Sequence, residues 1–120
     1  MPAKWIDYRG RKVLYVDVRQ ATSQEFVAAL READALARAS PSKILYLGNI
    51  EDAAVSREVM KVIKEIVDRM GRKMLIKLAV VGVAGVKKIL MDAVVSMFDR
   101  SGVPVRSFKT EPEALDWLVE

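Results

Sequence analysis

The sequence predicts one α/β domain over residues 1–120, with the element order ββαβαβαβα. Three observations lead to this prediction. Short apolar segments alternate along the chain with longer segments of helical periodicity, which is typical of strands joined by helical crossovers into a mainly parallel sheet. The segment Ile76–Val83 is almost wholly apolar, as a strand covered on both faces should be. The first two strands are joined by a compact turn, so the first strand is expected to lie antiparallel at an edge of the sheet.

These first two strands are predicted over Trp5–Tyr8 and Lys12–Val18. Gly10 lies between them, in a turn where glycine adopts positive φ at low cost. Thr22 and Glu25 then match a capping box, in which each side chain bonds the other residue's backbone N–H. A helix is therefore expected to begin at this point.

The first helix should end before the Ser-Pro-Ser segment at residues 40–42, and the next strand is predicted over Lys43–Leu47. The apolar stripe of that helix consists of Phe26, Ala29, Leu30, Ala33 and Ala37. Gly48–Asp52 follows the strand as a loop, and a second helix is expected to start near Ala54 or Ser56. Its inward residues are expected to be Val59, Ile63, Ile66 and Met70.

The second helix is expected to end with Gly71 as its C′ residue, since glycine is favoured there. After the apolar strand, the turn Gly82–Gly85 leads into a third helix. The predicted apolar stripe of this helix is Val86, Ile89, Leu90, Ala93, Val94 and Met97. A last strand is predicted over Val103–Phe108, and Thr110 with Glu113 should cap a closing helix.

The composition excludes several kinds of chemistry. The chain contains no Cys and no His. Thiolate nucleophiles, disulfides, Ser-His pairs and cysteine zinc sites are therefore excluded, and so is the usual general base near neutral pH. We expect a protein that is not an enzyme and that needs no cofactor or metal. The net charge of +4 permits an anionic partner without requiring one.

Charge and hydropathy indicate whether a membrane or a nucleic acid is a partner and which cellular compartment to expect. No apolar leader follows Met1, and the nearly uncharged run Leu78–Val86 is too short to span a bilayer. We therefore expect a cytoplasmic protein without a membrane span. Basic residues cluster near Arg9 and near Arg69, but the latter alternate with acids along the predicted helix. This pattern is typical of a solvated face, and no nucleic-acid partner is expected.

Four segments together resemble a known family. They are the hairpin around Tyr8-Arg9-Gly10, the strand Val13–Asp17, the unit Lys77–Lys88, and the closing segment Phe108–Leu118. On these segments the chain resembles the STAS/SpoIIAA-like family, and most closely its small, mostly uncharacterised single-domain branch. The resemblance implies a SpoIIAA-like fold and a non-catalytic regulatory domain that acts through protein–protein contacts.

In anti-sigma-factor antagonists of this family, a serine at the start of a helix is phosphorylated within an Asp-Ser-Ser-Gly-like motif. The corresponding segment here, Gly48–Ser56, lacks the paired serines and the glycine. Ser56 is its only hydroxyl, and the resemblance makes it a candidate phosphorylation site. Ser56 would serve equally well as the N-cap of the second helix, without any phosphate.

The best candidate ligand site lies in the turn before the third helix. Ligands of parallel α/β sheets collect beyond the carboxyl ends of the strands, and Gly82 and Gly85 should leave backbone N–H groups free at a helix N-terminus. Cations are unfavourable in a first helical turn, yet Lys87 and Lys88 lie there. These four residues are candidates for holding an anionic group such as a nucleotide, a phosphate or a lipid head group. The alternative is that the glycines only permit the turn and that the lysines snorkel towards solvent or pair with Glu51 and Asp52.

The candidate partner surface is a sheet face. Tyr15 and Tyr46 occupy equivalent places in neighbouring strands and are expected to share one face, with Asn49 at the strand end. Tyrosine suits an interface because it offers a large contact area with a polar tip. The alternative is that both rings belong to the core.

Two functional hypotheses follow. The first is a regulatory domain that binds a protein partner or a second copy of itself, as a homodimer, through the tyrosine face and the neighbouring turns. The second is a module that holds a small anionic ligand at the glycine–lysine turn. An open apolar pocket between helices would favour the ligand, and a closed core with an exposed apolar sheet face would favour association.

Overall fold

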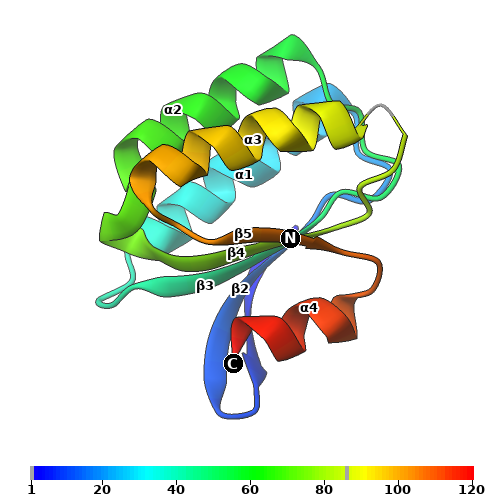
Figure 1. Ribbon diagram of the computed structural model, residues 1–120. Coiled ribbons are helices and arrows are strands. Elements are labelled where there is room, and N and C mark those ends of the chain that lie inside the picture. The colour runs from blue at the N-terminus through cyan, green and yellow to red at the C-terminus, as the bar shows by residue number, and fades with distance from the viewer. Residues whose placement is uncertain (1, 86) are drawn as a thin grey trace.

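The computed structural model describes residues 2–85 and 87–120, which form a five-stranded sheet in the order β1-β2-β3-β4-β5 (Figure 1). The strands are β1 (Ala3–Tyr8), β2 (Arg11–Asp17), β3 (Ile44–Asn49), β4 (Leu75–Val81) and β5 (Val105–Phe108). β1 pairs antiparallel with β2 at one edge, and the other pairings are parallel. The predicted element order, the mainly parallel sheet and the antiparallel edge strand are confirmed.

Helices cover both faces of this sheet, but unequally. The helices α1 (Ser23–Arg38), α2 (Arg57–Met74) and α3 (Lys87–Ser101) lie on one face, and the short α4 (Glu111–Leu118) lies on the other (Figure 1). The larger hydrophobic core lies between the sheet and the three helices, and a smaller core lies under α4. Among the described residues, no helix is long and apolar enough to cross a membrane.

Local sequence features account for the starts of these elements. Arg9 and Gly10 have φ angles of 50° and 80°, which closes the two-residue turn between β1 and β2. Thr22 accepts a hydrogen bond from Glu25 N, and the Glu25 carboxylate accepts one from Thr22 N, so the predicted capping box is present. Thr110 likewise caps α4 by accepting from the backbone N–H of Glu113.

Two predictions about the helices are wrong. The second helix does not end at Gly71 but continues to Met74, directly before β4. A glycine inside a helix costs only about 1 kcal/mol relative to alanine. Met70, the residue before it, is buried in the core. In α3, Ile89 was expected to face inward but is 73% exposed, whereas Met91 and Phe98 are buried. Val86, part of the same predicted stripe, lies outside the described residues.

Candidate functional site

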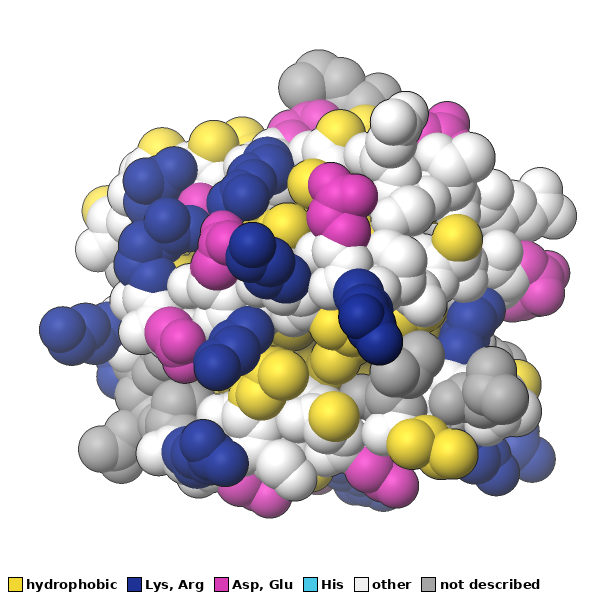
Figure 2. All heavy atoms as spheres, turned by 90° about the horizontal axis from the view of Figure 1, so that it is seen from above, with side chains coloured by type: hydrophobic (Ala, Val, Ile, Leu, Met, Phe, Trp, Pro, Cys, Tyr) yellow, Lys and Arg dark blue, Asp and Glu magenta, His cyan; other side chains and the backbone are white. Residues whose placement is uncertain are grey.

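An apolar cavity of about 120 Å³ lies between the sheet and the three helices that cover it, and it opens to the surface. Its floor comes from β2, β3 and β4, and its walls come from α1, α2 and α3. The side chains that line it are almost all hydrophobic, including Phe26 and Leu30 of α1, Met60 and Ile63 of α2, and Met91 of α3. Figure 2 looks down on this helical face, where hydrophobic side chains reach the surface between charged ones.

The position of α2 creates this space. The helix packs mainly on its neighbours α1 and α3 and makes fewer contacts with the strands beneath it. The floor strand β3 contributes Gly48, which has no side chain to fill the gap. A Cβ atom at Gly48 would lie 3.9 Å from Cε1 of Tyr46, so the tyrosine ring lies beside the space that the glycine leaves.

One of the two predicted lysines reaches the cavity. Lys87 lines it, and its Nζ donates a hydrogen bond to the carbonyl oxygen of Ile50 at 3.2 Å. Lys88 is exposed on the outer side of α3. Within residues 2–85 and 87–120, neither lysine forms an ion pair with Glu51 or Asp52. The part of the alternative in which the lysines pair with these two carboxylates is therefore wrong, and the part in which they snorkel is not contradicted.

The two predicted glycines differ in their surroundings. Gly82 has a φ angle of 94°, and a Cβ there would lie 2.5 Å from the backbone nitrogen of Glu51. Only glycine allows the β4–α3 turn to lie this close to the β3–α2 loop. Gly85 has a φ angle of 60°, but a Cβ there would meet nothing within 4 Å. Gly82 therefore allows the close approach of the two loops, and Gly85 only shapes the turn.

Part of the backbone of this turn is already hydrogen-bonded, which leaves fewer N–H groups for an anion than predicted. The backbone N–H of Lys87 donates to the carbonyl of Ala84 at 3.2 Å, and that of Lys88 donates to Gly85 at 3.1 Å. The free N–H groups that the sequence predicts for this turn therefore do not include these two. An anion at Lys87 would therefore be bound by the side chain and not by the backbone N–H.

The expectation that Tyr15 and Tyr46 share a sheet face is wrong. In the parallel pairing of β2 with β3, Leu14 lies opposite Tyr46 and Tyr15 lies opposite Leu47. Because successive side chains of a strand point to opposite faces, this register places the two tyrosines on opposite sides of the sheet. Tyr46 lines the cavity, and Tyr15 packs on the α4 side.

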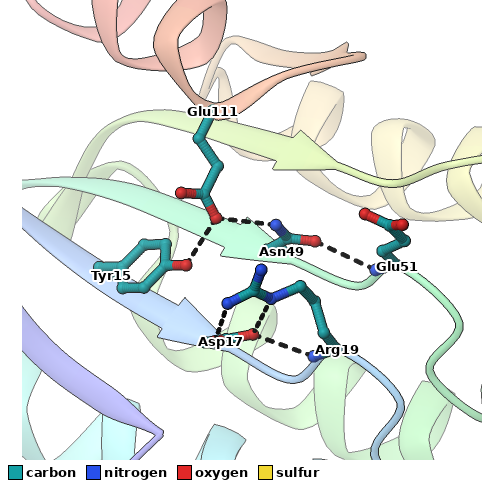
Figure 3. A network of polar contacts seen from close by, with 6 residues as sticks. All are labelled: Tyr15, Asp17, Arg19, Asn49, Glu51 and Glu111. Carbon is teal, nitrogen blue, oxygen red and sulfur yellow. Dashed lines mark hydrogen bonds and ion pairs between the residues drawn. The ribbon is translucent and has the colours of Figure 1, made fainter.

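Tyr15 and Asn49 belong instead to a polar cluster under the start of α4 (Figure 3). The Tyr15 hydroxyl donates to Oε2 of Glu111 at 2.5 Å, and Nδ2 of Asn49 donates to the same oxygen at 2.7 Å. Oδ1 of Asn49 accepts from the backbone N–H of Glu51 at 3.1 Å. Burial, together with the Glu111 hydrogen bond and charge, raises the pKa of Tyr15. The cluster joins α4 to the carboxyl ends of β2 and β3.

An ion pair between Asp17 and Arg19 lies beside this cluster (Figure 3). Nε of Arg19 donates to one carboxylate oxygen at 2.9 Å, and Nη2 donates to the other at 2.7 Å. The hydrogen bond with Arg19 lowers the pKa of Asp17. Among the described residues, no group of carboxylates could hold a metal ion.

Sequence reasoning missed a buried charge between α1 and α2. Asp34 is 3% exposed, and its Oδ2 lies 2.5 Å from Nη2 of Arg69 and 3.3 Å from Nη2 of Arg38. Its other oxygen, Oδ1, is buried without a hydrogen-bond partner. One feature of the sequence could have revealed this cluster. Ala33 belongs to the apolar stripe of the first predicted helix, and an acidic residue follows it directly.

Ser56 caps α2, as the alternative to phosphorylation predicts. Its Oγ accepts a hydrogen bond from the backbone N–H of Val59 at 3.2 Å and lies 2.5 Å from Oγ of Ser23. The residue is half-buried. Phosphorylation of Ser56 stays a prediction, and it would separate the two hydroxyls.

We expect Ser56→Ala to lower the free energy of unfolding by about 1 kcal/mol, because α2 loses its N-cap. Ser56→Asp should lose less, since aspartate caps helices well and its charge suits the helix N-terminus. Urea denaturation of both variants measures the difference. Equal losses would show that the Ser23 contact, and not the cap, is what stabilises this end of the helix.

Comparison with known proteins places the fold. No protein-family model and no curated protein matches the chain. Among solved structures, it is similar to the crystal structure of an uncharacterized protein of the DUF3478 family, with a SpoIIAA-like fold, from Shewanella loihica PV-4. The TM-score is 0.68 at 16% sequence identity, and the match covers 97% of this chain and 91% of the other. This chain has a SpoIIAA-like fold.

The SpoIIAA-like fold agrees with the family resemblance of the hairpin and of the strand–turn–helix unit. At this sequence identity the similarity concerns the fold alone. Function therefore has to be argued from the sites.

Proposed function

We propose that this protein is a non-enzymatic module that binds a small apolar carboxylic acid, with its apolar body in the cavity and its carboxylate at Lys87. The observation that carries the proposal is the open apolar cavity under α2, which the Lys87 side chain helps to line. Concave apolar sites with a few placed polar groups are the usual form of small-molecule sites.

The cavity lining favours an apolar body. Removing apolar surface from water contributes about 25 cal/mol per Å², and the lining offers little to a polar molecule. The volume of about 120 Å³ is somewhat below the roughly 150 Å³ of an apolar cavity that admits benzene. The unbranched side chains of Met60, Met70 and Met91 in the walls can adjust to a longer molecule, and the opening lets one end extend outward.

Lys87 favours an acidic end group. An ammonium group has three donors, and the Ile50 carbonyl accepts only one of them. The remaining donors can bind a carboxylate by charge-assisted hydrogen bonds. A carboxylate there would also offset the unfavourable position of a cation in the first turn of α3.

Binding is tested by isothermal titration calorimetry of the delipidated protein with decanoic acid, in low and high salt. We expect Lys87→Glu to weaken binding by about 10-fold or more, because a charged hydrogen bond is replaced by repulsion. Lys88→Glu is the matched control, since it makes the same charge change on an exposed side chain next to it. Its effect should stay within about 3-fold and vanish at high salt. Equal effects of the two substitutions would contradict the assigned position of the carboxylate, and no binding would contradict the proposal.

A second candidate function is the regulatory interaction domain implied by the family resemblance. Ile89, near the start of α3, is a large apolar side chain that is 73% exposed, and its substitution tests for a contact surface at this end of the helix. A homodimer or a protein partner, a cytoplasmic location and the lack of nucleic-acid binding stay predictions. Light scattering of the purified protein and of Ile89→Glu tests self-association at this surface.

A further inference from the structure

The floor of the cavity carries one polar side chain, Tyr46 of β3, among apolar neighbours. Tyr46 lies between Leu14 of β2 and Leu78 of β4, and it lines the cavity. Within the part of the chain that the structure describes, no group hydrogen-bonds to its hydroxyl. This sets it apart from the chain's other two tyrosines, because Tyr8 donates to Asp116 and Tyr15 donates to Glu111.

Tyr46 is half-buried, and a hydroxyl that lines an apolar cavity without a protein partner is unfavourable there. Phenylalanine would fill the same space without that cost. Burial, with a smaller contribution from the charge of Asp34, raises the pKa of Tyr46. Its hydroxyl is therefore protonated near neutral pH, and it can both donate and accept a hydrogen bond. Because Tyr46 lines the cavity, a molecule that enters the cavity can supply the partner that the described residues do not.

We propose that the ligand carries a second polar group, a hydroxyl or carbonyl oxygen within its apolar body, and that the Tyr46 hydroxyl binds it. This inference rests on the proposed function and specifies its ligand class. The preferred ligands are hydroxy or keto carboxylic acids, with the carboxylate at Lys87 and the internal oxygen at Tyr46. Unsubstituted fatty acids of the same length would leave the Tyr46 hydroxyl without a partner.

A preference for hydroxy or keto acids over unsubstituted fatty acids is physically expected at such a site. A site built to hydrogen-bond a ligand group binds the analogue without that group more weakly, since its own polar group then stays unpaired. Removing the site's hydroxyl should remove the preference without harming the apolar part of binding. Tyr46 is therefore assigned a role in specificity, and Lys87 holds the acid group in both kinds of ligand.

The test compares decanoic acid with a series of hydroxydecanoic acids that carry the hydroxyl at successive carbons, by calorimetry on the wild type and on Tyr46→Phe. We expect at least one isomer to bind the wild type about 10-fold more tightly than decanoic acid. In Tyr46→Phe this preference should disappear, while decanoic acid binds as well as before or better. Tyr15→Phe is the matched control, because it removes a hydroxyl on the other side of the sheet and should leave the preference unchanged.

The outcomes separate this inference from the proposed function. If decanoic acid binds but no hydroxy isomer is preferred, or if the preference survives in Tyr46→Phe, the inference is overturned and the proposed function stands. If neither decanoic acid nor any hydroxy isomer binds the wild type, the proposed function is overturned and the inference with it. Thermal unfolding of each variant without ligand shows whether a loss of binding reflects a loss of folding.

Discussion

Gly82→Ala is expected to lower the free energy of unfolding by about 3 kcal/mol or more. The first reason is conformational, since the φ angle of 94° is one that residues with a Cβ rarely adopt. The second reason is steric, since the new Cβ would lie 2.5 Å from the backbone nitrogen and 2.7 Å from Cα of Glu51.

The Glu51 backbone cannot easily move away from this clash. Its carbonyl accepts a hydrogen bond from Gln20 N at 2.9 Å, and the preceding Ile50 N donates to the carbonyl of Val81 at 2.8 Å. The substitution would therefore displace three loops that meet at the carboxyl end of the sheet. It should also weaken decanoic acid binding, because the Ile50 carbonyl that holds Lys87 lies in one of these loops.

Gly85→Ala is the control for the conformational part of this effect. Gly85 also has positive φ, at 60°, but a Cβ there would meet no atom within 4 Å. We expect a loss of about 1 kcal/mol from backbone strain alone. Urea denaturation compares the two variants. Similar losses would show that the contact with Glu51 relaxes at little cost.

The fold was predictable because local patterns and overall topology agree. The capping residues Thr22 and Thr110 mark helix starts, and the apolar strand after residue 75 identifies a sheet covered on both faces. Such agreement between local and global preferences is what makes a sequence specify one fold. The solved structure with a SpoIIAA-like fold supports the same conclusion.

The faces of the strands were less predictable. A shift of one residue in strand pairing moves every side chain to the other face, and tertiary packing decides the register. The two tyrosines have similar neighbours in the sequence and so suggest the same register position, whereas the structure pairs Tyr46 with Leu14.

The cavity could not be predicted either, because it depends on how far α2 lies from the sheet. Lys87 stands out in the sequence because a cation in a first helical turn breaks a local rule.

The second large effect is expected at the buried charge between α1 and α2. Removing one arginine that contacts Asp34 should cost more than removing Asp34 itself. We expect Arg69→Met to lower the free energy of unfolding by about 2–3 kcal/mol. Among the described residues, it leaves this buried carboxylate with Arg38 as its one ion-pair partner. We expect Asp34→Leu to cost about 1 kcal/mol or less, since the arginine side chains are 44% and 56% exposed and can turn to water.

The double variant Asp34→Leu with Arg69→Met should be about as stable as Asp34→Leu alone, because no uncompensated charge remains. Urea denaturation of the wild type and the three variants completes the cycle. Arg31→Met is the control, because Arg31 joins the same two helices through Glu65 at 3.2 Å in a pair whose side chains are 50% and 47% exposed. An exposed pair of this kind contributes about 0–1 kcal/mol.

The difference between the stability losses of Arg69→Met and Asp34→Leu distinguishes two roles for this cluster. If the ion pair mainly fastens α2 to α1, both single variants should lose similar amounts of stability. If the desolvated carboxylate dominates, Arg69→Met should lose more. In that case the Asp34 carboxylate lowers the stability of the fold, and the reason for its presence must lie in what α2 does. Because α2 forms a wall of the cavity, ligand affinity in Asp34→Leu is the measurement that connects this buried charge to binding.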